Sequence, residues 1–307
     1  MFLCHSDHLK QLCNLNSFAP KDNEMVFFGL RGVTPVDPDD VEFRPEHSLV
    51  LADIDYIHPR CSLLQWRPSS GEFAVFSGST VPHRKHVKTA LAKSGNGANQ
   101  LMTGFYKDYR KGVHKAGKST GHKAFRQTRA HPIRRTADDF DYDNDDRIEF
   151  VNPFDNIHAG WSMGVEHDSY ASAGCQVVVG YPDCDKRDSK GDAGAWKFFK
   201  GNAYEIDQQV FGYALLEGRN ALRIATRGPN NMVRLRFGSK GPLVQTVQDA
   251  LAAGGYYEGR TDDDFGDRTL RAVLAFQEAE FGPSADDGVV GPMTAGALGV
   301  DWPAQLD

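Results

Sequence analysis

The chain of 307 residues lacks any apolar run that approaches the roughly 18 residues needed to span a bilayer, so we expect no membrane insertion. Residues 1–20 also lack a basic region followed by an uninterrupted apolar one, which is the pattern of a Sec signal peptide. We therefore expect the protein either to be stored in the cytoplasm or to leave by lysis or a dedicated secretion system. An excess of positive charge is absent too. The formal net charge is −6, and we expect no nucleic-acid partner.

Cysteine is scarce and irregularly spaced. The five cysteines match no zinc-ribbon or CxxC pattern, and their odd number argues against a disulfide framework. We expect at least one free thiol, although a bond between the last two would be an alternative use of both. The cysteines are Cys4, Cys13, Cys61, Cys175 and Cys184.

A metalloprotease motif is also missing. No HExxH sequence is present, and no carboxylate lies at a familiar ligand spacing among the histidines of the central region. We therefore expect no metal and no cofactor. The histidines nevertheless keep a zinc peptidase as an alternative. They are His83, His86, His114, His122, His131 and His167.

The composition, with 40% apolar and 25% charged residues, is that of an ordinary globular protein. The chain is long enough for two domains. Turn residues cluster at 227–231, directly after an apolar segment, and mark the clearest boundary. We expect an N-terminal segment at 1–25, a large domain at 26–227, a linker at 228–234, a small domain at 235–300 and a tail at 301–307.

The large region reads as strand-rich with long loops. Two of its runs, 63–67 and 72–76, flank a Pro-Ser-Ser-Gly turn and predict a hairpin, and 87–93 has a helical pattern. Nothing shows a regular strand–helix–strand alternation, so we predict a β-rich, mixed α+β domain. The expected strands are 26–30, 48–54, 62–67, 72–76, 148–151 and 176–179.

The small region is predicted to be a three-helix module. Leu243, Val244, Val247 and Leu251 share one helical face, and a second face follows at 270–277. Residues 264–269 are echoed by 289–294, each with a glycine that closes a turn before a helix.

These residues resemble the peptidoglycan-binding domain of bacterial wall enzymes. The resemblance runs the whole length of the module, with one irregularity at 282–286. It implies that peptidoglycan is the binding partner. The matching positions are Leu235–Gly241, Val244, Val247–Gln248, Gly255–Tyr257, Asp262, Phe265–Gly266, Thr269, Ala272–Val273, Phe276–Gln277 and Asp287–Pro292.

Charge is distributed unevenly in the large region. From 83 to 135 there are 14 Lys or Arg residues against the single acid Asp108, whereas 138–149 holds seven acids against Arg147. One interpretation is two solvated loops that neutralise each other. The other is a basic wall along a cleft, which attracts an anionic polymer or a substrate carboxylate.

Cys175 and His158 form the clearest catalytic pattern. They lie 17 positions apart, which is enough for a loop to bring thiol and imidazole within reach. An adjacent imidazole activates a thiol that is otherwise mostly protonated at neutral pH. Gly174 carries no Cβ and lets backbone N–H groups approach a developing oxyanion. We also consider Asn156 as a residue that orients His158.

The same segment resembles the L,D-transpeptidase catalytic domain. His158-Ala159-Gly160 and Ser172-Ala173-Gly174-Cys175 occupy the places of that family's two motifs. The resemblance implies catalysis by Cys175, His158 and Gly174, and substrate contacts at Gly160, Ser172 and Ala173. Ala173 stands where the family has histidine, and Gln176-Val177 where an aliphatic residue and arginine are usual. These departures leave open which acceptor is used and whether the reaction is a transpeptidation.

Together these features predict a cell-wall enzyme that acts on peptidoglycan stem peptides through a thioester on Cys175. An amine acceptor would give crosslinking, and water would give carboxypeptidase or endopeptidase action. A zinc-dependent wall peptidase and a non-catalytic wall-binding protein are the alternatives. Release by lysis would suit a phage endolysin, and a dedicated secretion system an antibacterial toxin, with an immunity or secretion partner.

Overall fold

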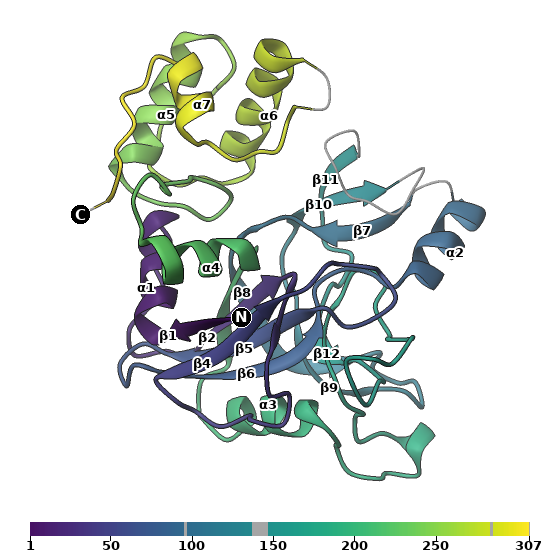
Figure 1. The fold of residues 1–307 in the computed structure, drawn as a ribbon. Helices are drawn as coiled ribbons and strands as arrows, with labels where there is room; N and C mark the ends of the chain where they lie inside the picture. Colours follow the sequence, from purple (N-terminus) through teal and green to yellow (C-terminus); the bar gives the residue numbers. More distant parts are fainter. Residues whose placement is uncertain (95–96, 137–146, 283–284, 307) are drawn as a thin grey trace.

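The computed structural model describes residues 1–94, 97–136, 147–282 and 285–306. Its β-rich part is built on a closed barrel in the order β12-β13-β6-β5-β2-β14-β8-β9 (Figure 1). The strands are β2 (Val26–Arg31), β5 (Cys61–Arg67), β6 (Glu72–Ser79), β8 (Gly104–His114), β9 (His122–Arg126), β12 (Ile157–Ala159), β13 (Gln176–Val178) and β14 (Val210–Glu217).

The barrel strands follow from the apolar runs of the sequence. All six residues of β2 are buried, as expected for a strand covered on both faces. β5 and β6 form the predicted hairpin around 68–71, with Arg67 opposite Glu72 and Leu63 opposite Phe76. β12 and β13 are parallel, and so are β14 and β2, whereas the other barrel pairs are antiparallel.

Aromatic side chains fill one core of the barrel. Phe27 stacks on Phe211 with ring centroids 4.4 Å apart, and Phe125 packs edge-on against both. Helix α3 (Ala195–Tyr204) adds Trp196 and Phe199 to this cluster. The geometry is that of favourable edge-to-face and offset aromatic pairs, so this core gives the neighbouring strands a rigid support.

Residues 1–25, expected as a separate N-terminal segment, pack onto the barrel. They form β1 (Phe2–His5) and α1 (Ser6–Leu15), and β1 joins β4 (Glu46–Leu51) and β3 (Val33–Pro35) in a three-stranded sheet. Leu9 and Leu12 of α1 lie in one cluster with Phe28 of β2 and Ile224 of α4 (Gly218–Arg227). The N-terminal residues therefore share the core of the large region.

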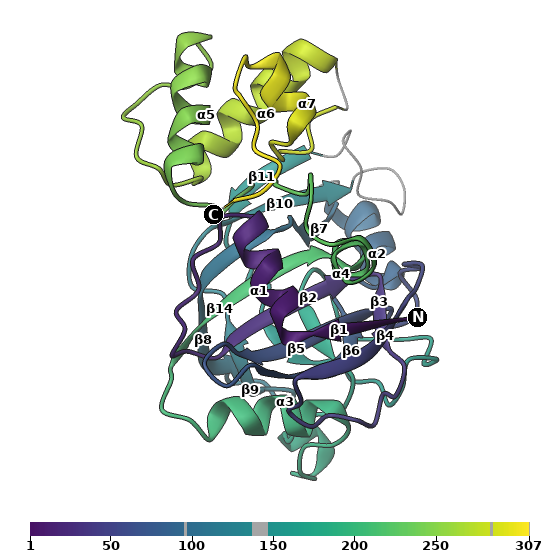
Figure 2. The same ribbon diagram turned by 60° about the vertical axis from the view of Figure 1, so that its left-hand side comes forward.

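A second three-stranded sheet lies between the barrel and the helical part (Figures 1 and 2). It consists of β11 (Arg147–Val151), β10 (His131–Thr136) and β7 (Ala98–Leu101), in that order. Helix α2 (Arg84–Ser94) covers the predicted helical stretch 87–93, and a 3-10 turn spans Asp185–Arg187. Strand β4 ends at Leu51, before the predicted limit of 54.

The helical part contains α5 (Pro242–Ala253), α6 (Asp267–Phe281) and α7 (Pro292–Ala297). The sequence echo is a structural repeat: Gln248 bonds to Asp262 and Thr269, and Gln277 bonds to Asp287 and Thr294. In each half a buried amide ties a loop to the start of the next helix. The prediction of a mixed α+β chain, β-rich first and helical at its C-terminal end, is confirmed.

The two parts are in direct contact. The backbone N–H of Phe105 in β8 donates to the carbonyl O of Phe237 at 2.9 Å. A Cβ on Gly238 would lie 2.3 Å from the carbonyl O of Phe105, so only glycine allows this approach. Trp302, in the predicted tail, packs against both the barrel-side and the helical clusters. No helix in the described parts of the chain is long and apolar enough to cross a membrane.

Candidate active site

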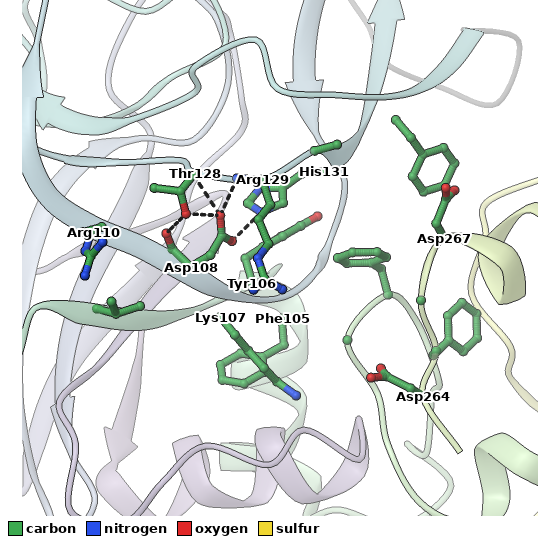
Figure 3. Close-up of a pocket in the computed structure, with 17 residues that line it drawn as sticks. Phe105, Tyr106, Lys107, Asp108, Arg110, Thr128, Arg129, His131, Asp264 and Asp267 are labelled. Atoms are coloured by element: carbon green, nitrogen blue, oxygen red, sulfur yellow. Dashed lines mark hydrogen bonds and ion pairs between the residues drawn. The ribbon is translucent and has the colours of Figure 1, made fainter. Parts of the chain in front are cut away.

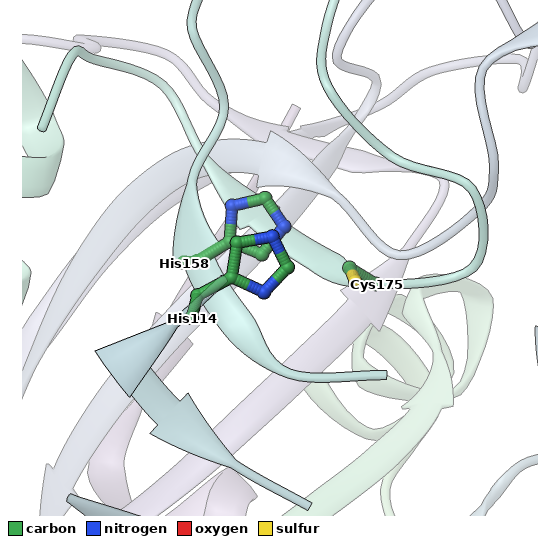
Figure 4. A group of neighbouring side chains, drawn as sticks. All are labelled: His114, His158 and Cys175. Carbon is green, nitrogen blue, oxygen red and sulfur yellow. The ribbon is translucent and has the colours of Figure 1, made fainter. Parts of the chain in front are cut away.

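Strand pairing brings the two predicted catalytic residues together (Figure 4). His158 is the central residue of β12, and Cys175 immediately precedes β13. These strands are parallel, and His158 lies opposite Val177. Cys175 is therefore two residues along the chain from the position opposite His158. Figure 4 shows the thiol and the imidazole next to each other, with a third side chain, His114, beside them.

His114 belongs to this site and was not among its predicted residues. It is the last residue of β8, and its ring stacks on that of His158 with centroids 4.0 Å apart and planes 16° apart. One nitrogen of each histidine and the sulfur of Cys175 all lie within 4.8 Å of one another. His114 is paired across the β8–β9 hairpin with His122, whose ring centroid is 5.5 Å from that of His158.

Backbone contacts assign the proton of His158. Its Nδ1 lies 2.8 Å from the carbonyl O of Ala159, which only accepts hydrogen bonds. The proton of the neutral ring is therefore on Nδ1, and Nε2 carries the lone pair that accepts a proton. The orienting group is thus the backbone of the adjacent residue.

The suggestion that Asn156 orients His158 is wrong, because Asn156 holds His114. Its Oδ1 accepts from the backbone N–H of Gln127 at 3.0 Å, so its Nδ2 faces His114 Nδ1, also at 3.0 Å. Nδ2 donates and Nδ1 accepts, which leaves the proton of His114 on Nε2. The site therefore pairs a proton acceptor, His158, with a hydrogen-bond donor, His114.

Burial keeps both Cys175 and His158 neutral. Desolvation, aided by the neighbouring His114 and His122, lowers the pKa of His158 well below its usual value. Desolvation and the nearby His122 lower the pKa of His114 to about 3. Burial, together with the charge of Asp155, raises the pKa of the Cys175 thiol. Cys175 is thus a thiol beside a neutral imidazole.

The loop before Cys175 requires glycine at position 174. Gly174 has φ +139°, and a Cβ there would lie 2.0 Å from Nδ2 of Asn99 and 2.6 Å from Oδ1 of Asp155. The backbone N–H of Gly174 donates to Ser172 Oγ at 3.2 Å, so this N–H is already engaged. The hydroxyl of Ser172 in turn donates to the carbonyl O of Cys175 at 2.6 Å.

The three predicted substrate contacts occupy different places. Ala173 is exposed and lines the cavity at Cys175. Ser172 is buried and fixes the loop through the bonds just described. Gly160 is buried as well, and its backbone N–H donates to Val178 O at 2.6 Å. Of the three, Ala173 is the one in the wall of the cavity.

A cavity of about 480 Å³ opens onto the thiol. Cys175 is 9% exposed, and its Sγ lies 3.6 Å from the carbonyl O of Phe154, which has a positive φ of 62°. Lys115 and Arg126 line the same cavity and make it attractive to a carboxylate. The cavity thus combines the Cys175 thiol with two positively charged side chains, and His158 lies buried behind the thiol.

Asp155 lines this cavity and is 3% exposed. Desolvation raises the pKa of Asp155 to about 7, although the amide of Asn99 donates to its Oδ2 and opposes the shift. The backbone of Asp155 is fixed as well, because its N–H donates to Gln127 Oε1 at 2.9 Å and its carbonyl accepts from the Tyr109 hydroxyl at 3.0 Å.

A second cavity, of about 640 Å³, lies between the barrel and the helical part (Figure 3). It contains Asp108, whose carboxylate bonds to His131 Nε2 at 2.5 Å and to the backbone N–H of Thr128 at 2.9 Å. Burial alone would raise the pKa of Asp108, but the bonds from His131 and Thr128 hold it below its usual value. These bonds make the pair a structural tie between β8 and β10.

The basic stretch 83–135 is divided among several sites. Lys115 and Arg126 line the cavity at Cys175, and Lys107, Arg110 and Arg129 line the second cavity. Most of the acidic stretch 138–149 lies outside the described residues, which resume at 147. Its last residue, Glu149, pairs with Arg135 and Arg147 at 2.5 and 2.7 Å.

The residues that could hold a metal are the ones already named. Within the described ranges, the cluster of potential ligands is His114, His158 and Cys175. The two rings are nearly parallel, so their in-plane lone pairs do not converge on a common ion without rotation of one ring. Of the other histidines considered for zinc, His122 is a neighbour of this cluster, whereas His83 faces the carbonyl O of Asp168 and His131 faces Asp108.

All five cysteines are free and buried, so the alternative Cys175–Cys184 bond is not formed. This leaves the Cys175 thiol available at the cavity.

Comparison with known families identifies the helical part. The family described as "Putative peptidoglycan binding domain" matches residues 240–298. Residues 240–298 therefore form a peptidoglycan-binding domain, as their resemblance predicted, and they connect the chain with the cell wall. No curated protein and no solved structure matches the chain.

Proposed function

We propose that the β-rich part is a cysteine acyltransferase or peptidase that acts on the stem peptides of peptidoglycan. The observation that carries this proposal is a group of three neighbours: the Cys175 sulfur, which lines the cavity, the buried His158 imidazole, a nitrogen of which lies within 4.8 Å of that sulfur, and the Ala159 carbonyl that fixes the tautomer of this imidazole. The peptidoglycan-binding domain supplies the substrate class. The resemblance to L,D-transpeptidases around Cys175 agrees with this chemistry.

In the proposed reaction His158 Nε2 takes the thiol proton as sulfur attacks an amide carbonyl carbon of the stem peptide. The tetrahedral intermediate then collapses, the C–N bond breaks, and the leaving amine takes the proton from His158. This leaves a thioester on Cys175. An incoming amine or water next attacks the thioester, gives its proton to His158, and the thiol is released with that proton.

His114 has a separate task in this scheme. Its proton is fixed on Nε2 by the hydrogen bonds from Gln127 through Asn156, and one nitrogen of its ring lies within 4.8 Å of the Cys175 sulfur and of a nitrogen of His158. A fixed donor beside the nucleophile stabilises negative charge on the substrate oxygen. The engaged N–H of Gly174 makes such a side-chain donor more important here. Lys115 and Arg126 would bind a stem-peptide carboxylate at the rim.

Incubation of purified sacculi with the protein tests this proposal. Muropeptides are then separated and identified by mass spectrometry. We expect new or lost stem-peptide bonds with the wild type, and none with Cys175→Ala. The matched control is Cys184→Ala, since Cys184 is also free and buried but does not line the cavity, and this variant should keep full activity.

Two further arms separate the alternatives. Activity that persists in EDTA supports the thiol mechanism, whereas loss to EDTA together with retention in Cys175→Ala would establish a metal-dependent peptidase. Unchanged muropeptides with the wild type, alongside retained binding to sacculi, would reduce the protein to a wall-binding role and overturn the enzymatic proposal.

A further inference from the structure

A third cavity, of about 500 Å³, lies where the barrel, α4 and the start of the helical part meet. Its wall is strongly basic, with five arginines against the two carboxylates of Glu217 and Asp287. The arginines come from β2, β10, α4 and the segment before α5. They are Arg31, Arg134, Arg219, Arg234 and Arg236, and we call this cavity the arginine pocket.

Neutral oxygens hold Arg31 on the barrel side of this pocket. Arg31 is 7% exposed and donates to Thr80 Oγ1 at 3.2 Å and to the carbonyl O of Leu101 at 3.0 Å. Its Nη1 lies 3.7 Å from a carboxylate oxygen of Glu217. The oxygens of Thr80 and Leu101 satisfy hydrogen bonds of Arg31 but carry no formal charge.

Arg236 is the least satisfied of the set. It is 5% exposed, and its Nη1 donates to Thr103 Oγ1 at 2.8 Å. Its Nε is buried and finds no hydrogen-bond partner among the described residues. Desolvation lowers the pKa of Arg236 to about 10, and desolvation also lowers that of Arg234. The charges of Asp287 and Glu217 oppose the shift of Arg236, but five guanidinium groups against two carboxylates leave an excess of positive charge. Such an excess is costly where it is buried, so the pocket favours an anion.

The two acids do not remove this excess. Asp287 is exposed, and its Oδ1 accepts from Gln277 Nε2 at 2.8 Å and from the backbone N–H of Val289 at 2.8 Å. It therefore serves the internal repeat of the helical domain. Glu217 faces Arg31 at a distance too long for a hydrogen bond.

We propose that the arginine pocket binds an oxyanion, a phosphate or carboxylate group, that bridges the barrel and the peptidoglycan-binding domain. Guanidinium groups bind both classes by paired, charge-assisted hydrogen bonds. The bound group contacts Arg31 on the barrel and Arg234 and Arg236 on the other side, and so stabilises the arrangement of the two parts. This site is separate from Cys175 and does not depend on the proposed reaction.

Titration calorimetry and thermal unfolding with inorganic phosphate test the proposal. Ionic strength is held constant with sodium chloride, so that general screening cancels. We expect saturable binding and a rise in the unfolding temperature for the wild type and equally for Cys175→Ala. Arg219→Gln and Arg234→Gln should each weaken binding by about tenfold or more, as loss of a charged hydrogen bond does.

Arg227→Gln is the matched control, because Arg227 is exposed on the same helix as Arg219 but does not line the pocket. It should leave binding unchanged. A peptide that ends in a D-alanine carboxylate forms the second arm, and the tighter of the two ligands identifies the source of the oxyanion. Failure of both ligands to bind the wild type, or an equal loss in Arg227→Gln, would overturn the proposal.

Discussion

At the scale of single residues, the candidate site depends on where protons reside. His158 carries its proton on Nδ1 and His114 carries it on Nε2, because one ring faces a carbonyl and the other faces an amide N–H. The two stacked imidazoles therefore differ: Nε2 of His158 can accept a proton, whereas Nε2 of His114 can donate a hydrogen bond. Their burial keeps both imidazoles neutral, and burial also raises the pKa of the Cys175 thiol, so the thiol is protonated.

Asp155 makes stability depend on pH. Its pKa of about 7 in the folded protein exceeds the ordinary value of 3.8, so the folded state holds a proton that the unfolded state has lost. The wild type therefore loses stability as the pH rises from about 4 to 7, by up to about 1.4 kcal/mol per pH unit, and no further above 7. Asp155→Asn should remove this slope, and its advantage over the wild type should grow across that window.

Denaturant unfolding of both proteins between pH 4 and 8 measures the effect. Asp22→Asn is the control, since Asp22 is exposed and the same charge is removed. A constant difference between Asp155→Asn and the wild type across the window would show that Asp155 is not protonated in the folded state, contrary to this expectation.

The sequence predicts the nucleophile and the base but not their surroundings. Cys175 and His158 stand in local motifs, and a parallel strand pair joins them. His114 precedes His158 by 44 positions, and strand β9 lies between their strands in the barrel. A usable signal did exist, because His114 and His122 flank a glycine-containing turn and so face each other across a hairpin. That they would stack on β12 follows from barrel closure, which no local pattern encodes.

At the scale of elements, local patterns predict the paired strands well. The Pro-Ser-Ser-Gly turn and alternating residues fix the β5–β6 hairpin. The structure of the N-terminal residues is harder to predict, because β1 pairs with β4, which lies more than 40 positions later. Long-range pairing of this kind depends on the barrel that supports it, and the sequence pattern of residues 1–15 alone does not indicate it.

The internal repeat of the helical domain rests on two buried amides. Gln248 accepts from the backbone N–H of Asp262 at 2.9 Å and donates to Thr269 Oγ1 at 2.9 Å. Gln248→Leu removes all the hydrogen bonds of this buried amide, which tie α5 to the loop at 262–264 and to Thr269. We therefore expect a loss of about 2–4 kcal/mol in the stability of this domain. Gln245→Leu is the control, because Gln245 is exposed on the same helix.

Urea unfolding followed by circular dichroism measures that loss, and binding to sacculi at a temperature below unfolding shows whether the fold survives. Equal stability of Gln248→Leu and Gln245→Leu would mean that the hydrogen bonds of Gln248 contribute nothing net to the domain.

At the scale of the whole molecule, the barrel and the peptidoglycan-binding domain are in direct contact. The backbone of β8 meets residues 237–238 directly, and Met102 of the barrel side lies in the hydrophobic cluster of the helical domain. Under the proposed function, this contact would limit which wall bonds can reach Cys175 once the domain is bound. It would then affect selectivity as well as stability.

Gly238 tests this coupling because it combines a positive φ of 90° with the close approach to Phe105. Gly238→Ala adds backbone strain and a clash with a carbonyl of β8, whereas Gly255→Ala adds strain alone, since φ is 78° and nothing lies within 4 Å of its Cβ. The strain in each costs on the order of 1 kcal/mol. In calorimetry we expect Gly255→Ala to lower one shared unfolding transition slightly. Gly238→Ala should lower it further and divide it in two, because the clash separates the parts that unfold together. A single transition of equal temperature in both variants would show that the contact at 105 and 238 does not couple them.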